Sequence, residues 1–148
     1  STIRCGAQAQ KWGSFRIGAV PDGEVTLLPD GGCRGRYRRL GTGAEISRTL
    51  HVESGGARIR IVDDVSDVGG ASSRFVLAPD VTAERLEGTV ALVRGDAAVA
   101  SLSFGAGVEV RVRTVPFYPS IGESVTTIAV DLSFERSAEW RIQLGKPG

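Results

Sequence analysis

The sequence predicts an all-β protein, a two-layer antiparallel β-sandwich of about a dozen short strands. Apolar and polar residues alternate with a period of two in many short segments, and turns rich in glycine, proline and aspartate separate these segments. No stretch shows the period of an amphipathic helix. Two packed sheets are expected, because a single open sheet of this size would leave one apolar face in water.

Size and composition support a single domain over residues 1–148. A chain of 148 residues is long enough to bury a core, and its 41% hydrophobic and 24% charged residues are ordinary for a globular protein. The 20 glycines fit many turns between short strands rather than disorder. The chain contains no methionine and begins at Ser1, so we expect a piece of a longer protein.

We expect the strands in regular succession, each bounded by turn residues. In chain order they are Ser14–Val20, Glu24–Leu28, Gly35–Leu40, Glu45–Glu53, Ala57–Asp63, Ser73–Leu77, Ala83–Leu86, Thr89–Val93, Ala98–Phe104, Val108–Val115, Val125–Phe134 and Glu139–Leu144. Within the fifth of these, Ile59 and Ile61 alternate with Arg58 and Arg60. The tenth alternates valine with charged residues, so its valines are expected in a core and its charges in solvent.

The charge balance argues against binding to nucleic acid or to a membrane surface. The net charge is +1, but the first 62 residues hold ten Lys and Arg against five Asp and Glu, whereas the rest hold eight against twelve. The first half therefore suits an anionic ligand. No apolar run is long enough to cross a bilayer, and the first residues lack the layout of a signal peptide.

A basic cluster surrounds Tyr37. On a strand, Arg34, Arg36 and Arg38 share one face, while Tyr37 and Arg39 share the other, so three guanidinium groups line up to bind carboxylates or sulfates. The alternative is a solvated edge strand whose charges prevent pairing with other sheets. Both interpretations stay open at this point.

The single histidine, His51, is the one residue of a type that ordinarily changes its charge near neutral pH. It shares a polar strand face with Ser47 and Thr49, opposite Leu50 and Val52. It suits a substrate contact or an acid-base role, but no nucleophilic motif surrounds it, and an ordinary surface histidine is the simpler interpretation.

The other polar and aromatic residues favour structural roles. Asp63, Asp64 and Asp67 lack the rest of a calcium loop and are interpreted as turn carboxylates at a strand end. With a single histidine no zinc site is expected, and the glycine-rich turns precede no helix, so no nucleotide cofactor is expected either. Cys5 and Cys33 are expected to remain separate thiols.

The aromatic residues Trp12, Phe15, Tyr118 and Trp140 have two interpretations. Their ring faces suit stacking against sugars, and they equally suit packing in a core. For Trp140, which lies between Glu139 and Arg141 on the last expected strand, core packing is the preferred interpretation.

Four stretches, in this order and spacing, give the sequence a resemblance to the C-terminal β-sandwich region of the heparinase II/III-like polysaccharide lyases. They are Lys11–Arg16, Ile46–Leu50 with Arg60–Val65, Arg74–Val81, and the closing strand pair ending at Trp140–Ile142. The resemblance implies a parent enzyme in which an upstream α/α-toroid cleaves uronate-containing polysaccharide by β-elimination, and it favours a periplasmic or secreted location for that parent.

The resemblance transfers no catalytic residue to this chain. The family's tyrosine, histidine and amide side chains lie mostly in the toroid, and its His-Ala-Asp motif is absent here, because Val52 and Glu53 follow His51. Ile46 and Ser47 stand where the family often has a histidine and a basic residue before Arg48. We therefore expect a non-catalytic domain that contacts the toroid and an acidic polysaccharide. An independent carbohydrate-binding or protein-interaction sandwich is the alternative.

Overall fold

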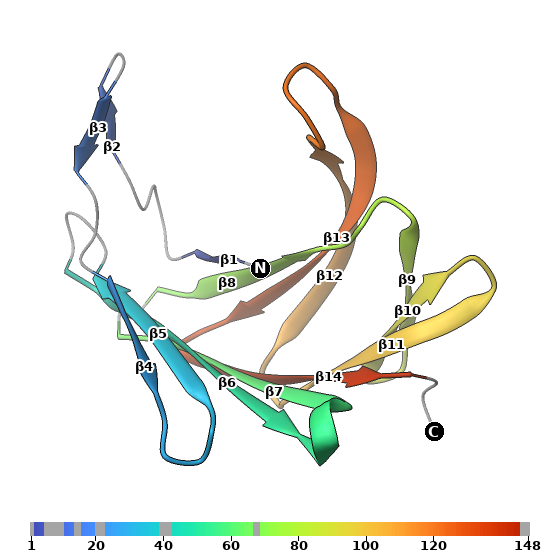
Figure 1. Ribbon diagram of the computed structural model, residues 1–148, viewed down its shortest axis with the longest axis horizontal. Helices are drawn as coiled ribbons and strands as arrows, with labels where there is room; N and C mark the ends of the chain where they lie inside the picture. The colour runs from blue at the N-terminus through green and yellow to red at the C-terminus, as the bar shows by residue number, and fades with distance from the viewer. Residues whose placement is uncertain are drawn as a thin grey trace.

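The structure is a computed structural model of the 148-residue chain. It describes residues 2–4, 11–13, 16–19, 23–38, 43–66 and 69–145, the first three of these ranges as backbone only. Most of the described chain is β-strand, and its helical part is one short 3-10 turn, η1 (Ser54–Gly56) (Figure 1). No helix in these ranges is long and apolar enough to span a membrane.

Two antiparallel sheets face each other (Figure 1). The large sheet contains, in spatial order, β4 (Gly23–Leu27), β5 (Cys33–Arg38), β6 (Glu45–Glu53), β7 (Arg58–Val65), β14 (Ser137–Leu144), β11 (Ala97–Phe104), β10 (Thr89–Arg94) and β9 (Val81–Leu86). The small sheet contains β1 (Thr2–Arg4), β8 (Ala71–Val76), β13 (Val125–Phe134) and β12 (Glu109–Phe117). The predicted β-sandwich is confirmed.

A separate short hairpin pairs β2 (Lys11–Gly13) with β3 (Arg16–Ala19). β3 lies inside the first predicted strand, Ser14–Val20, whereas β1 and β2 were not predicted. Segments of three residues are too short to show a period, so sequence alternation does not reveal them. For β6 and β13 the predicted bounds are those of the structure.

The core lies between the inner faces of the two sheets. Its most buried large apolar side chains come from both layers, each exposed by 1% or less: Ile46, Val90, Leu102 and Trp140 of the large sheet and Val130 and Leu132 of the small sheet. Phe75 of β8 packs edge-on against Trp140 of β14, with ring centroids 5.9 Å apart. Core packing, the preferred interpretation of Trp140, is confirmed.

Candidate functional site

The three arginines Arg34, Arg36 and Arg38, here called the arginine ladder, lie on the outer face of the large sheet. All three are exposed, whereas Cys33 and Tyr37 between and beside them are half-buried. The alternation predicted for this strand is therefore confirmed. Because alternate residues of a strand are about 7 Å apart, the three guanidinium groups lie in a row along β5.

Each member of the arginine ladder has a different environment. Arg36 Nε lies 2.6 Å from Oε1 of Glu24 on β4, and this hydrogen bond and the charge of Glu24 raise the pKa of Arg36 above its usual value. Arg34 donates from Nε to Oγ1 of Thr49 on β6, at 3.1 Å. Among the described residues, Arg34 and Arg38 form no ion pair. These two groups carry the positive charge that remains for a ligand.

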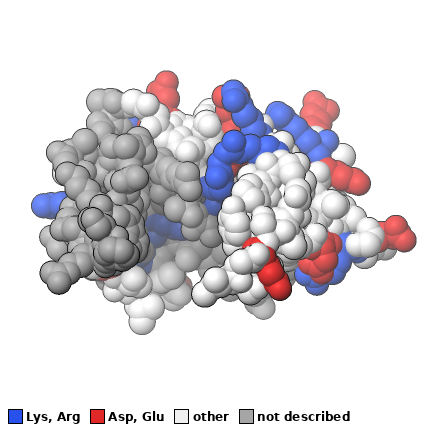
Figure 2. Space-filling view, turned by 90° about the horizontal axis from the view of Figure 1, so that it is seen from above, with Lys and Arg blue, Asp and Glu red and all other residues white. Residues whose placement is uncertain are grey.

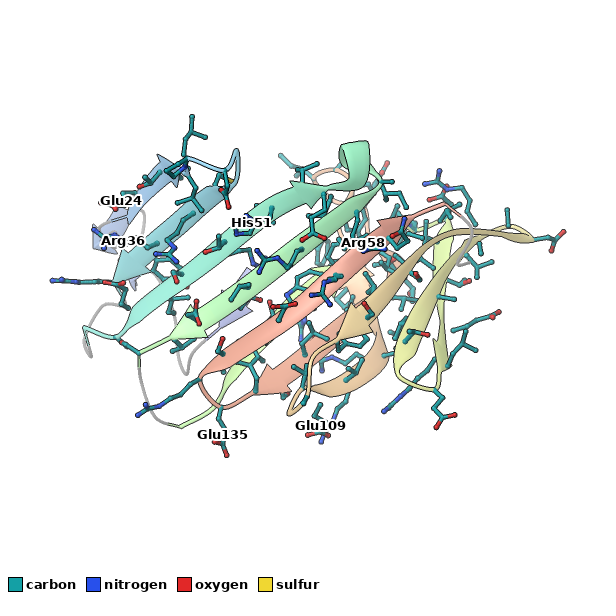
Figure 3. The ribbon with its side chains drawn as sticks, turned by 90° about the horizontal axis from the view of Figure 1, so that it is seen from below. Glu24, Arg36, His51, Arg58, Glu109 and Glu135 are labelled. Atoms are coloured by element: carbon teal, nitrogen blue, oxygen red, sulfur yellow. The ribbon has the colours of Figure 1, made fainter. Side chains whose placement is uncertain are left out.

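A shallow hollow of about 220 Å³ lies at one end of the ladder. Its lining residues come from three neighbouring strands: Gly23, Glu24, Arg36, Tyr37, Arg38 and Glu45. Although Tyr37 packs inward against the cluster around Ile46 and Val65, it reaches the rim of the hollow. The structure thus brings Arg36, Tyr37 and Arg38 to one place, and Figure 3 shows His51 further along the same face.

His51 lies beneath the turn that joins β4 and β5. Its Nδ1 is 3.1 Å from Oδ2 of Asp30, and Oδ1 of the same carboxylate accepts a hydrogen bond from Gly32 N at 3.1 Å. A Cβ atom at Gly32 would lie 2.8 Å from His51 Nδ1 and 2.8 Å from the carbonyl oxygen of Leu50, so this close approach requires glycine.

The interpretation of His51 as an ordinary surface residue is therefore corrected, because its side chain is 17% exposed and has a carboxylate partner. Within the described ranges, no hydroxyl or thiol is hydrogen-bonded to His51, so the structure provides no nucleophile beside it. The geometry fits a role in fixing the turn next to the arginine ladder.

A polar cluster that the sequence did not predict lies between the two sheets. This inner cluster consists of Arg48 on β6, Asp63 on β7, Ser73 on β8 and Trp140 on β14. Arg48 binds Asp63 through two hydrogen bonds, of 2.6 Å from Nε and 2.8 Å from Nη2, and Arg48 also donates to Ser73. The Arg48 guanidinium lies 5.6 Å from the centroid of the Trp140 ring.

Every oxygen of the Asp63 carboxylate is occupied. Besides the bonds from Arg48, Oδ2 accepts hydrogen bonds from Ser73 Oγ at 2.8 Å and from Trp140 Nε1 at 3.1 Å, and Asp63 is 0% exposed. The prediction of turn carboxylates at a strand end is wrong for Asp63 and Asp64, since both lie within β7. Asp67 is outside the described residues.

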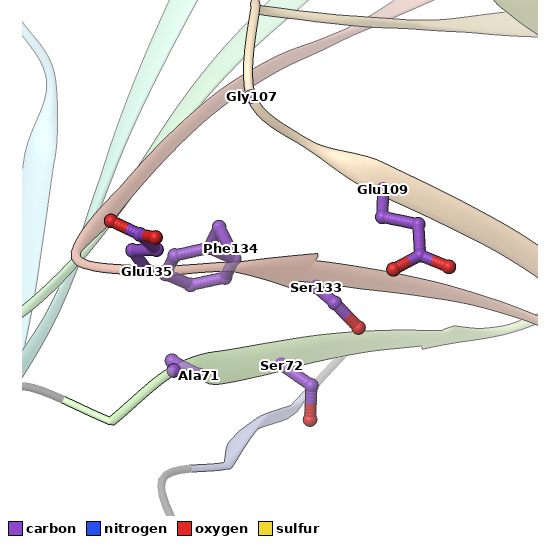
Figure 4. A pocket seen from close by; sticks show the side chains of 8 residues that line it. Ala71, Ser72, Gly107, Glu109, Ser133, Phe134 and Glu135 are labelled. Carbon is purple, nitrogen blue, oxygen red and sulfur yellow. The ribbon is translucent and has the colours of Figure 1, made fainter.

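A second hollow, of about 590 Å³, lies at the ends of β8 and β13 and beside the turn before β12 (Figure 4). Its polar groups are the hydroxyls of Ser72 and Ser133 and the carboxylates of Glu109 and Glu135. Figure 4 shows the two carboxylates on opposite sides of the hollow, so they do not converge on one atom. The described residues contain no cluster of His, Cys, Asp and Glu that fits a metal ion.

The structure also places some of the aromatic residues and cysteines that the sequence analysis singled out. Tyr118 is 69% exposed in the connection between β12 and β13, whereas the side chains of Trp12 and Phe15 are outside the described residues. Cys33 is a free thiol on the inner face of β5, and Cys5 is outside the described residues. In the coloured part of Figure 2, Lys and Arg lie close to Asp and Glu beside an uncharged area.

Comparisons of sequence find no relative. No protein-family model matches the chain, and no curated protein sequence matches it. Comparison of the fold, in contrast, finds matches among solved structures.

The structure of the heparan sulfate lyase HepC from Pedobacter heparinus matches 84% of this chain and 22% of its own, with a TM-score of 0.66 and 7% identity. A heparinase III, the BT4657 gene product, matches 84% of this chain and 21% of its own, with a TM-score of 0.60 and 10% identity. The form of this heparinase III with methylated lysines matches 87% of this chain and 21% of its own, with a TM-score of 0.59 and 10% identity.

At these identities the likeness concerns the fold. This chain spans about a fifth of the length of the solved heparinase chains. The resemblance to heparinases that the sequence predicted is thus confirmed at the level of the fold: this chain has the fold of a β-sandwich domain that occurs in heparinase III structures.

Proposed function

We propose that this chain is a non-catalytic β-sandwich domain of a polysaccharide lyase and that it supports an upstream α/α-toroid, the domain that cleaves uronate-containing polysaccharide. The observation that carries this proposal is the fold match, which covers 84% of this chain and only 22% of a heparan sulfate lyase. A fold that forms about a fifth of a longer lyase is expected to act together with the rest of that chain.

The chemistry of β-elimination supports the non-catalytic role. The reaction needs a group that neutralises the uronate carboxylate, a base that removes the C5 proton and an acid for the leaving oxygen. In the described part of the chain, the buried carboxylate of Asp63 is saturated by hydrogen bonds and His51 is held by Asp30. Neither group lines any of the hollows given by the described residues.

The assay compares this 148-residue chain with the complete protein encoded by its gene. Both are incubated with heparan sulfate, hyaluronan and alginate, and unsaturated products are followed by their ultraviolet absorbance. We expect product from the complete protein on at least one substrate and none from this chain. Product from this chain alone would overturn the non-catalytic role, and an upstream coding region without a helical domain would overturn the lyase proposal.

The arginine ladder supports a second function, binding of an acidic polysaccharide by an independent sandwich domain. Arg38 is exposed and Arg34 lacks an acidic partner among the described residues, so the outer face offers two uncompensated guanidinium groups. Guanidinium groups bind sulfates and carboxylates through paired hydrogen bonds. The coding region upstream of Ser1 separates the two functions, because the independent domain needs no toroid.

A further inference from the structure

The small sheet covers only part of the large sheet. It reaches the large sheet through contacts such as Ser73 on Asp63 and Phe75 on Trp140, which lie over β7 and β14. Paired residues of neighbouring strands point to the same face of the sheet. Val25 of β4 is paired with Gly35 of β5, which is paired with Arg48 of β6. Leu27 of β4 is likewise paired with Cys33 of β5, which is paired with Leu50 of β6. Val25 and Leu27 therefore belong to the inner face, beyond the part that the small sheet covers.

These inner-face residues are exposed to solvent. Val25 is 79%, Leu27 83% and Val52 67% exposed, whereas Ile61, on the same face of β7, is 3% exposed. Together with the half-buried Cys33 and Leu50, the exposed residues form an apolar surface, which we call the bare inner patch: Val25, Leu27, Cys33, Leu50 and Val52. Arg48, which is bound to Asp63, borders this patch on the same face. The inner face of the large sheet thus extends beyond the core, and its residues there are exposed to solvent.

The edge strand β4 adds a second feature to this patch. All five of its residues are exposed, and among the described strands it pairs with β5 alone. Its charged residue, Glu24, points to the outer face and binds Arg36. An edge strand with exposed apolar residues and free backbone groups tends to associate with other surfaces, and proteins usually cover or charge such an edge.

We propose that the bare inner patch is the docking surface for a second folded domain of the same polypeptide, which contacts it through apolar side chains. The inference rests on the proposed function and specifies which face of the large sheet contacts the rest of the protein. In the heparan sulfate lyase, about four fifths of the chain lies outside the match to this fold, so the fold is attached there to a much larger body. The apolar patch is unsuited to an acidic polysaccharide, for which the arginine ladder on the opposite face is suited.

Hydrogen exchange on the complete protein tests this assignment. The variant with Val25→Asp and Leu27→Asp places two charges in the patch, and Thr26→Asp is the matched control, because Thr26 lies on the same strand and faces the other way. In the unchanged protein we expect the backbone amides of β5 and β6 near the patch to exchange more slowly than in the isolated 148-residue chain. The double variant should lose this difference, by roughly tenfold or more in rate, whereas the control should keep it.

Core amides around Trp140 serve as the internal reference for folding, and Leu27→Thr is a milder variant in case the double variant unfolds. Equal exchange in the complete protein and the isolated chain, or no effect of either patch variant, would overturn the docking surface while leaving the proposed function intact. If the isolated chain forms a dimer and Leu27→Thr dissociates it, the patch binds a second copy of this chain and the proposed docking of another domain is overturned. A gene without any further domain would instead contradict the proposed function.

Discussion

Two arginine–carboxylate pairs of this protein share one distance and differ in their surroundings. Arg48 Nε lies 2.6 Å from Asp63 Oδ1, and Arg36 Nε lies 2.6 Å from Glu24 Oε1. The side chains of the first pair are 15% and 0% exposed, and those of the second are 48% and 53% exposed. The inner pair lies between the sheets, and the outer pair lies in water on β4 and β5.

The difference shows that the geometry of an ion pair does not determine its role. The outer pair is screened by water and salt, so it adds little to stability, and Arg36 can exchange Glu24 for another anion. Asp63 in the inner pair has no such freedom, because Ser73 and Trp140 complete its hydrogen bonds. Since Ser73 belongs to the small sheet, the inner pair also connects the two layers.

Removal of the inner carboxylate should have the largest effect. Asp63→Ala removes the buried carboxylate that Arg48 binds through two nitrogen atoms, and we expect the free energy of unfolding to fall by about 3–5 kcal/mol. Urea denaturation measures it. Asp64→Ala is the control, because it removes a carboxylate from the same strand on the other face and should cost less than about 1 kcal/mol. Equal losses of unfolding free energy for the two variants would show that the inner pair contributes no more to stability than the Asp64 carboxylate does.

The connection between the layers should have an intermediate effect. Ser73→Ala removes one hydrogen bond to the Asp63 carboxylate and one from Arg48, and we expect a loss of about 1–3 kcal/mol in the free energy of unfolding. Ser72→Ala, the neighbouring residue on the outer face of β8, is the control. If both serine variants unfold at the same urea concentration, the hydrogen bonds from the small sheet contribute nothing measurable.

The outer face should have the smallest effect on stability and a visible effect on binding. With Arg36→Ser and Arg38→Ser combined, we expect an unchanged unfolding midpoint and earlier elution from a heparin column in a salt gradient. The combination of Arg111→Ser and Arg113→Ser removes an equally spaced pair from β12 and serves as the control. Equal elution of the two double variants would contradict a role of the arginine ladder beyond net charge.

The pKa of Arg36 determines how retention due to this residue depends on pH. Glu24 raises this pKa, and a base with a raised pKa loses its positive charge only at a higher pH than usual. A guanidinium is protonated throughout the neutral and mildly alkaline range in any case, so the charge of Arg36 is present there. The difference in elution between the unchanged chain and the ladder variant should accordingly persist when the column is run at mildly alkaline pH.

Much of the fold was predictable from the sequence, because period-two alternation between turn residues is a local signal. It predicted the bounds of β6 and β13 and the shared face of Arg34, Arg36 and Arg38. The heparinase-like fold came from the order of four short stretches, although no sequence comparison finds a relative.

The inner cluster was harder to predict, because its members come together only through the register of four strands. A signal was nevertheless present: Asp63 continues the inward series of Ile59 and Ile61, and Arg48 stands between Ile46 and Leu50. Opposite charges at inward positions of neighbouring strands indicate a buried pair. The position of His51 under the turn depends on the close approach of Gly32, which alternation does not report.

Because Trp140 is buried between the two sheets, its fluorescence reports on the packing of the sheets. Its indole touches Phe75 of the facing sheet and binds Asp63, and 1% of its surface is exposed. Any separation of the layers would admit water to this ring and shift its fluorescence to longer wavelength. With Trp12 replaced by phenylalanine, a single emission spectrum would report in real time whether the two layers remain closed.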